Sequence, residues 1–195
     1  MNRVQVVEYD PEWPRVFERI RSYVWPAVRD VALELEHVGS TAVVGLKAKP
    51  IIDACIVVGS TKDIPACIER LARIGYVHKG DLGVPGREAF GRPDHLPRHH
   101  LYLSARDSLS LKNHLGLRDY LRSHPEAARE YGELKALLAS RHPTDIDSYL
   151  VGKSEFILHI LGKIGFGEDE LTEIRRINEM PNLLRPNSTS PPSEG

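Results

Sequence analysis

The sequence predicts an α/β protein of the α+β kind, with a small mixed β-sheet, flanking helices and a helical C-terminal layer. Three stretches have the β-branched or alternating apolar pattern of strands, at residues 33–38, 50–58 and 98–104. Three later stretches have apolar residues at helical spacing behind a capping residue, at residues 108–123, 125–142 and 144–161. The change of pattern near residue 106 therefore predicts a sheet-forming part followed by a helical part.

The remaining elements are predicted from local signals, taken in order along the chain. Val4–Glu8 alternates and predicts a short strand, and Asp10 followed by Pro11 is typical of a helix start. The helix that follows has an apolar face formed by Trp13, Val16, Phe17, Ile20, Val24 and Val28. Later signals predict a capped helix at 61–75, a short strand at 76–79, an exposed loop rich in glycine and proline at 80–97, and a last helix at 168–180.

The length and composition predict a single domain. A chain of 195 residues with 41% hydrophobic composition buries one good core. We expect this domain to cover residues 1–180, with the sheet in about 1–106 and the helical layer in about 107–180. Residues 181–195 are rich in Pro, Asn and Ser and predict a disordered tail.

The charge balance and the cysteine spacing argue against several classes of protein. Lys plus Arg number 26 and Asp plus Glu number 27, so no overall field favours nucleic acid or an anionic membrane. Cys55 and Cys67 have neither metal-ligand spacing nor the pattern of a disulfide framework. The sequence has no run of 18 apolar residues and no apolar signal segment at its start. These features predict a cytoplasmic protein without a membrane span.

The stretch 35–58 predicts a phosphate-binding turn between two strands. Gly39 allows the backbone to come close to a ligand, and the hydroxyls of Ser40 and Thr41 add donors. Asp53 is the single charge in the apolar strand that follows, and an unpaired buried carboxylate is strongly destabilising. We therefore expect Asp53 to face a cation or to lie at an accessible strand end. A structural role as a cap or turn partner is the alternative.

Six motifs along the chain resemble one known family. They are His37-Val-Gly-Ser-Thr-Ala42, Gly45-Leu-Lys-Ala-Lys49-Pro-Ile-Ile-Asp53, Arg98-His-His100-Leu-Tyr-Leu103, His114-Leu-Gly-Leu-Arg118, Tyr131-Gly-Glu-Leu-Lys135 and Tyr149-Leu-Val-Gly-Lys153. Together they resemble the GrpB-like family, which belongs to the nucleotidyltransferase superfold, over roughly residues 5 to 165. The resemblance implies a nucleotidyltransferase-like fold and a phosphate site.

The resemblance also implies acidic residues that hold divalent metal ions against phosphate oxygens. Asp53 matches one of these acids, but Cys55 occupies the second position and the third falls at His100 or Tyr102. We expect Asp53 and His100 to be the catalytic and metal-binding residues, with Mg²⁺ or Mn²⁺ as the ion. Because the second and third positions lack a carboxylate, the sequence argues against two closely spaced metal ions. His37 either adds an imidazole that suits Mn²⁺ or Zn²⁺, or hydrogen-bonds the turn.

Basic residues supply the other half of an anion site. Lys49 and Arg98 each precede a strand, and Arg118 and Lys153 lie on predicted helices. All four would face a phosphate group if the helical layer covers the cleft, and the alternative for each is a solvated or salt-bridged surface position. The full set of expected phosphate-binding residues is His37, Gly39, Ser40, Thr41, Lys49, Arg98, Arg118 and Lys153.

Three functions are compatible with the sequence. The first is a metal-dependent nucleotidyltransferase that moves a nucleoside monophosphate from a nucleoside triphosphate to an acceptor. The second is a catalytically reduced protein of the same fold that binds a nucleotide or another phosphorylated small molecule, and Cys55 in the place of an acid favours it. The third is a histidine-rich metal hydrolase, which nine histidines permit. It ranks last because His95 and His99 flank Pro97 and do not share a helix face.

Overall fold

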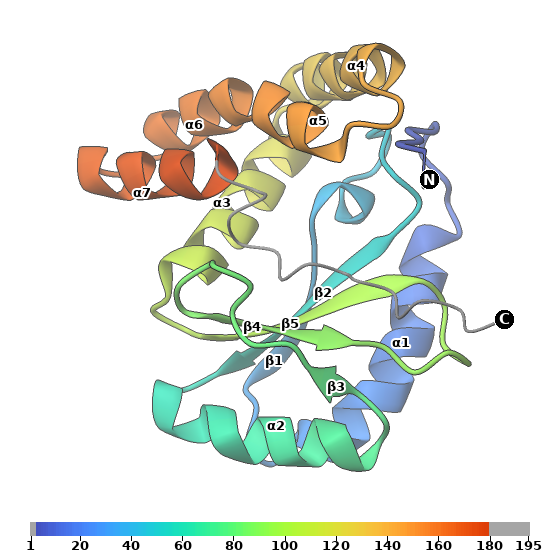
Figure 1. Ribbon diagram of the computed structural model, residues 1–195, viewed down its shortest axis with the longest axis vertical. Helices are drawn as coiled ribbons and strands as arrows, with labels where there is room; N and C mark the ends of the chain where they lie inside the picture. Colours follow the sequence, from blue (N-terminus) through green and yellow to red (C-terminus); the bar gives the residue numbers. More distant parts are fainter. Residues whose placement is uncertain (1–2, 180–195) are drawn as a thin grey trace, which may run out of the picture.

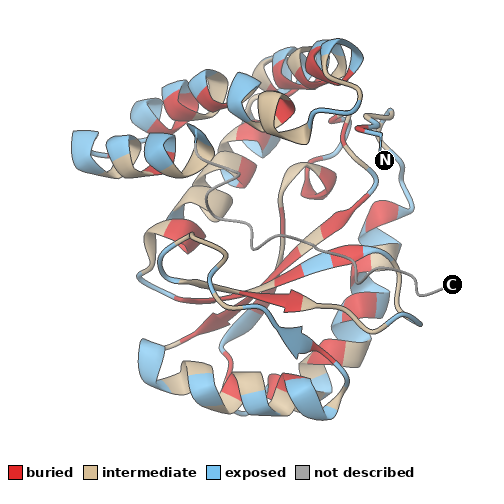
Figure 2. Ribbon diagram, in the orientation of Figure 1, coloured by how far each residue is buried: buried red, intermediate tan, exposed pale blue. Residues whose placement is uncertain are grey.

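The computed structural model describes residues 3–179 and is built on a five-stranded sheet in the order β1-β2-β5-β4-β3. β2 and β5 run parallel, and every other neighbouring pair is antiparallel. The sheet is therefore mixed, as predicted, and Figure 2 shows buried residues along both β2 and β5. The strands are β1 (Glu34–Val38), β2 (Ile52–Val58), β3 (Val77–His78), β4 (Arg87–Gly91) and β5 (His99–Ala105).

Two helices, α1 (Trp13–Val28) and α2 (Ile64–Arg73), cover one face of the sheet (Figure 1). The predicted apolar face of the first helix is confirmed, since its buried residues are Trp13, Phe17, Ile20, Val24 and Val28. The helix begins later than predicted because the Asp10 carboxylate accepts a hydrogen bond from the Glu12 amide outside the helix. A 3-10 turn, η2 (Thr61–Asp63), leads into the second helix.

The chain after the sheet is helical, as predicted. The first of these helices packs Leu111 and Leu115 against Cys55 and Val57 on the second face of the sheet. In Figure 1 the last four helices lie on the opposite side of the sheet from α2. The helices are α3 (Leu109–Ser123), α4 (Pro125–Arg141), α5 (Ile146–Gly152), α6 (Ser154–Lys163) and α7 (Glu168–Glu179).

Three predictions about elements are wrong. The segment Val4–Glu8 makes only one isolated bridge, between Val7 and Ala48, because the amide of Val4 is bonded instead to a carbonyl of the helical layer. The predicted loop 80–97 contains β4, whose short sequence is hidden among glycines and charges. The predicted helix 144–161 is two helices, separated by a turn at Lys153.

Two further features concern the thiols and the membrane. Cys55 and Cys67 are both buried as free thiols, so no disulfide joins them. Within residues 3–179, none of the helices is long and apolar enough to cross a membrane. The predicted tail at 181–195 lies outside the described residues.

Candidate functional site

Asp53 and His37 lie on opposite faces of the sheet. Cross-strand partners share a face, and side chains alternate along a strand. Asp53 is paired with Val38 of β1 and with His100 of β5, so these three residues share the face that α3 covers. His37 is one residue out of phase with Val38 and stacks on Phe17 of α1, with 4.6 Å between ring centroids. The register of the sheet therefore separates Asp53 from His37 and joins it to His100.

Asp53 and His100 form a hydrogen-bonded pair on this face. The Nδ1 atom of His100 lies 2.8 Å from Oδ1 of Asp53. Burial, the largest single influence, raises the pKa of Asp53, but the hydrogen bond from His100 and the nearby charges together hold that pKa below its ordinary value. Because an ionised carboxylate only accepts hydrogen bonds, Nδ1 of His100 donates its proton to Asp53. In the neutral form of the His100 ring, the Nε2 atom is then the proton acceptor.

Gly39 brings the backbone directly against the Asp53 carboxylate. It follows β1 with a φ of 70°, which favours glycine, and leads into the 3-10 turn η1 (Ser40–Ala42). A Cβ atom at this position would overlap Oδ2 of Asp53. The glycine is therefore required both by the backbone conformation and by the closeness of the carboxylate.

A pocket of about 780 Å³ opens above Asp53 and His100. Asp53 is the only carboxylate among the described residues that line it. A cleft lined mainly by one sign of charge concentrates ligands of the opposite sign, so this pocket favours a polyanion. Six basic side chains line it, from Arg3, Lys49, Lys79, Arg87, Arg98 and Lys153.

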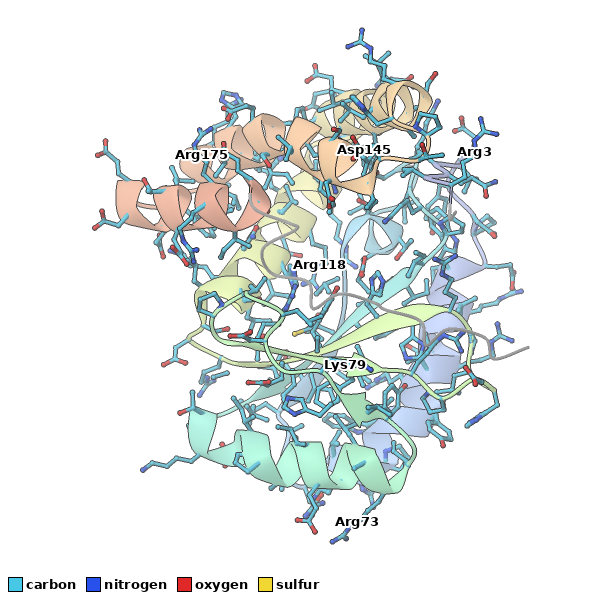
Figure 3. The ribbon with its side chains drawn as sticks, in the orientation of Figure 1. Arg3, Arg73, Lys79, Arg118, Asp145 and Arg175 are labelled. Atoms are coloured by element: carbon cyan, nitrogen blue, oxygen red, sulfur yellow. The ribbon has the colours of Figure 1, made fainter. Side chains whose placement is uncertain are left out.

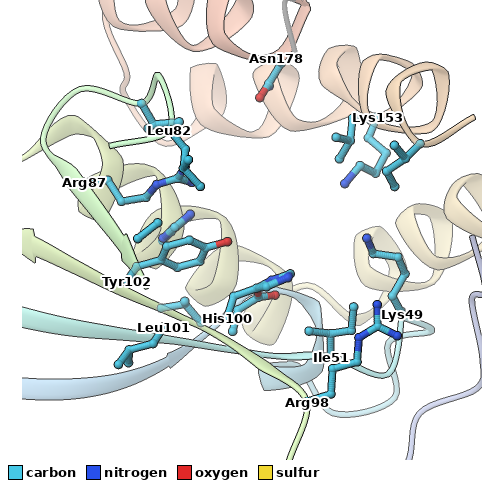
Figure 4. Close-up of a pocket in the computed structure, with 18 of the residues that line it drawn as sticks. Lys49, Ile51, Leu82, Arg87, Arg98, His100, Leu101, Tyr102, Lys153 and Asn178 are labelled. Carbon is cyan, nitrogen blue, oxygen red and sulfur yellow. The ribbon is translucent and has the colours of Figure 1, made fainter. Parts of the chain in front are cut away.

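Two expected phosphate ligands, Lys49 and Lys153, point toward each other at one end of the pocket, with Arg98 beside Lys49 (Figure 4). The Nζ atoms of Lys49 and Lys153 lie 5.8 Å and 4.9 Å from the centroid of the Tyr149 ring. Burial, aided by the charge of Lys49, lowers the pKa of Lys153 to about 8. A bound anion would favour the charged form of this lysine and raise its pKa again.

Arg87 and Tyr102 lie at the other end of the pocket (Figure 4), and His114 lies beside Tyr102. The sequence analysis did not predict these three as site residues. The guanidinium carbon of Arg87 lies 4.6 Å from the Tyr102 ring centroid, and the ring of His114 is 5.7 Å from that of Tyr102. Burial lowers the pKa of His114 to about 4, so its ring is neutral at pH 7. Among the described residues, Nε of Arg87 and Nδ1 of His114 are buried without a hydrogen-bond partner.

Sequence signals for two of these three residues exist. Tyr102 alternates in phase with His100 along β5, and His114 lies one helical turn before Arg118 in one of the motifs. Arg87 has no such signal because the sequence places it in a loop. The pairing of β4 with β5, which puts Arg87 opposite Ser104, brings it to the pocket face.

Four expected phosphate ligands do not line the pocket: His37, Ser40, Thr41 and Arg118. Nε2 of His37 lies 3.0 Å from Oγ1 of Thr41, and burial lowers the pKa of His37 to about 4. Arg118, which is labelled on α3 in Figure 3, pairs with Glu36 at 2.5 Å and donates a hydrogen bond to the carbonyl oxygen of His37 at 3.0 Å. These contacts join β1 to α3 and to the turn that follows β1, which is a structural role.

The family model described as GrpB protein matches residues 3–163 of this chain. The chain belongs to the GrpB protein family. The solved structure of the conserved protein GrpB from Enterococcus faecalis is 33% identical in sequence, with a TM-score of 0.72. That match covers 88% of this chain and 98% of the other, so the mixed sheet and its helices are a shared architecture.

Other relatives of this GrpB protein differ in length. The glutamate-rich protein GrpB of Alkalihalophilus pseudofirmus is 32% identical, over 83% of this chain and 95% of that protein. The UPF0157 protein YqkA of Bacillus subtilis is 35% identical, over 80% of this chain and 45% of that protein. A dephospho-CoA kinase of Mycolicibacterium paratuberculosis is 30% identical, over 77% of this chain and 43% of that enzyme. The chain thus spans less than half the length of the last two.

The pocket of this GrpB protein offers few metal ligands. The part of the chain that is described contains no group of three His, Cys, Asp or Glu side chains placed to share an ion. Cys55 lies two residues after Asp53 on the same face, and burial raises the pKa of its thiol to about 12, so the thiol is protonated at pH 7. Mg²⁺ is commonly held by one or two carboxylates together with phosphate oxygens and water. Asp53 and His100 therefore fit one ion that arrives with a polyphosphate and do not fit two protein-held ions.

The histidines of this GrpB protein also do not assemble a hydrolase site at the pair noted in the sequence. His95 packs edge-on against Tyr23, with 5.2 Å between ring centroids. His99 lies on the other face of the sheet from Asp53, between the hydroxyl of Tyr76 at 2.8 Å and the carbonyl oxygen of Pro97 at 2.7 Å. The two rings therefore have separate structural partners.

Proposed function

We propose that this GrpB protein binds a nucleoside triphosphate in the pocket and transfers its nucleoside monophosphate to an acceptor. The observation that supports this proposal is the combination, in one pocket, of six basic side chains with a single carboxylate that orients a histidine. The basic residues suit a polyphosphate, and about 780 Å³ lies within the usual range for small-molecule sites. A nucleotidyltransferase-like fold is part of the same proposal.

The proposal gives each residue a defined role. Lys49, Arg98 and Lys153 bind oxygens of the triphosphate, and Gly39 lets the ligand approach the backbone beside Asp53. Nε2 of His100 accepts the proton of the acceptor hydroxyl while Asp53 holds the ring. The acceptor oxygen then attacks the α-phosphorus, and pyrophosphate leaves.

A divalent ion, Mg²⁺ or Mn²⁺, is the cofactor in this proposal. Asp53 would hold it through the oxygen that His100 does not use, and His100 could ligate it through Nε2 only in place of its role as the base. When bound, such an ion offsets the negative charge that develops on the leaving pyrophosphate.

The name of one relative supports phosphate chemistry. The dephospho-CoA kinase that matches this chain is, by its name, an enzyme of phosphoryl transfer. Because the match covers 43% of that enzyme, it supports the class of ligand and not the reaction.

A second candidate function is binding of a nucleotide or another phosphorylated small molecule without transfer. The observation that favours it is the buried thiol of Cys55, which occupies the position of a second metal-binding acid. Both candidates predict the same ligand in the same pocket. They differ in whether pyrophosphate is released.

The test is a thermal-shift and pyrophosphate-release screen with the four ribonucleoside triphosphates and Mg²⁺ or Mn²⁺. A ligand at about 100 times its dissociation constant stabilises the folded protein by about 2.7 kcal/mol. We expect metal-dependent stabilisation and pyrophosphate release in the wild type and in Asp107→Asn, an exposed control, with loss of both in Asp53→Asn. Stabilisation without pyrophosphate for any acceptor supplied would favour the binding function, and no shift with any nucleotide would refute the transferase proposal and nucleotide binding alike.

A further inference from the structure

Lys135 is a buried lysine on α4 that has no hydrogen-bond partner among the described residues. Its exposed fraction is 2%, and its Nζ atom is fully covered. It belongs to the inward face of the helix, between Tyr131 and Leu138. A buried ammonium group without a counter-ion is strongly destabilising, so Lys135 is either neutral or compensated by an anion from outside the chain.

The groups that face Lys135 come from three different elements. On α4 itself, the Tyr131 ring centroid lies 4.6 Å from Nζ, and that ring stacks on Phe156 of α6. Lys153, at the turn between α5 and α6, repels a charge on Lys135, and Asp53 of β2 attracts it. Burial, aided by Lys153, lowers the pKa of Lys135 to about 6. The amine is therefore mainly neutral at pH 7 when the pocket holds no anion.

Lys153 connects this buried lysine to the pocket. Tyr131 precedes Lys135 by four residues, and Tyr149 precedes Lys153 by the same spacing, so each lysine lies over a tyrosine one helical turn earlier. Lys49 approaches the Tyr149 ring from the loop before β2. Lys49 and Lys153 line the pocket, and Lys135 lies behind that lining.

We propose that Lys49 and Lys153, with Lys135 behind them, form the subsite for the terminal phosphate of the ligand, and that Lys135 takes up a proton when this phosphate enters. The inference rests on the proposed function. It specifies that the end of the pocket lined by Lys49 and Lys153, here called the lysine end, binds the terminal phosphate. A phosphate dianion adds negative charge beside Lys153, and this charge acts on Lys135 through the low-dielectric interior. The ligand class is therefore one with a terminal phosphate, such as a nucleoside triphosphate.

The test measures proton uptake on binding of inorganic tripolyphosphate, which has the phosphate chain without a nucleoside. Titration calorimetry at pH 7 in two buffers of different ionisation enthalpy gives the number of protons taken up. We expect the wild type to take up more protons than Lys135→Met, with a difference that approaches about one proton per site. Binding to the variant should be about tenfold to a hundredfold weaker.

Two controls keep the result unambiguous. Methionine has the length of lysine and suits a buried site, so Lys135→Met is expected to fold, and circular dichroism checks this. Lys163→Met changes an exposed lysine on the neighbouring helix and should match the wild type. Equal proton uptake and equal affinity in wild type and Lys135→Met would overturn the inference.

Comparing a nucleoside triphosphate with tripolyphosphate distinguishes failure of this inference from failure of the proposed function. If a nucleoside triphosphate binds and tripolyphosphate does not, the phosphate chain is not held at the lysine end, and this inference is wrong while the proposed function stands. If neither ligand binds the wild type, the proposed function fails and this inference fails with it.

Discussion

Replacing Lys135 with methionine should stabilise the protein at neutral pH, and the gain should shrink as the pH rises. Burial lowers the pKa of this amine to about 6 in the folded protein, whereas an exposed lysine has a pKa of about 10.4. Between these values the unfolded state binds a proton that the folded state does not. The free energy of unfolding of the wild type therefore falls as the pH is lowered through this window, and it levels off below about pH 6.

The size of the effect is obtained from the pKa difference, at about 1.36 kcal/mol per unit. At pH 7 the pH is about 3.4 units below the pKa of the unfolded amine, so burying Lys135 in its neutral form costs about 5 kcal/mol. At pH 9 the same cost is about 2 kcal/mol. Methionine removes the cost at both values. The stability advantage of Lys135→Met over the wild type should thus fall by about 3 kcal/mol between pH 7 and pH 9.

Urea denaturation of both proteins at pH 7, 8 and 9 measures this difference directly. Lys163→Met, which changes an exposed lysine, should show no such trend relative to the wild type. A stability difference that stays constant with pH would mean that Lys135 keeps its charge in the folded protein. That result would refute the reasoning about its burial and the proton uptake inferred from it.

Three further predictions concern the turn after β1 and the Asp53 pair. Gly39→Ala should lower the free energy of unfolding by about 1 to 2 kcal/mol because of the positive φ alone. The overlap of the new Cβ atom with Asp53 should also abolish the ligand-induced thermal shift. Arg118→Met leaves the Glu36 carboxylate without its partner and should lower the free energy of unfolding by about 2 to 3 kcal/mol; adding Glu36→Gln should restore part of the loss, and a fully additive double variant would contradict the pairing. Although burial raises the pKa of Asp53, the bond from His100 holds it below its ordinary value, so this carboxylate stabilises the fold above about pH 4 and the contribution is lost as the pH falls through the lowered pKa. Acid unfolding of Asp53→Asn should therefore show a weaker pH dependence below about pH 4 than the wild type, and identical acid transitions would count against the pair.

The sequence predicted the fold best where the signal is local. β2 is a continuous apolar β-branched run, and the apolar face of α1 recurs at helical spacing, so both were predictable without knowledge of their neighbours. β4 was missed because its five residues gain their strand character from pairing with β5, a contact between distant parts of the chain. The strand predicted at Val4–Glu8 was wrong for the opposite reason. The segment has the alternating pattern of a strand, but it forms only an isolated bridge and no ladder with a neighbouring strand.

The sequence indicated some of the residues that line the pocket, but it did not predict their geometry. Asp53 was identifiable as a charge inside an apolar strand, and its pairing with His100 lies in the parallel register of β2 and β5. His37 was chosen for its residue type, and the same register places it on the face that α1 covers. Lys135 ends one of the six motifs but was not predicted as a site residue, because burial depends on how α4 packs and a lysine in a helix is usually exposed.

The parallel pairing of β2 with β5 has a consequence for the order in which the chain folds. Asp53 and His100 are 47 residues apart in sequence, and β3 and β4 lie between them. Contacts of such separation require the entropy of loop closure to be lost before any of their energy is gained, which makes them slow to form. We expect the β4 and β5 hairpin to assemble first and to dock onto β2 afterwards. The proton on His100 is therefore oriented only in molecules that have completed this docking step, and partly folded chains would have the basic residues of the pocket without its acid and histidine pair.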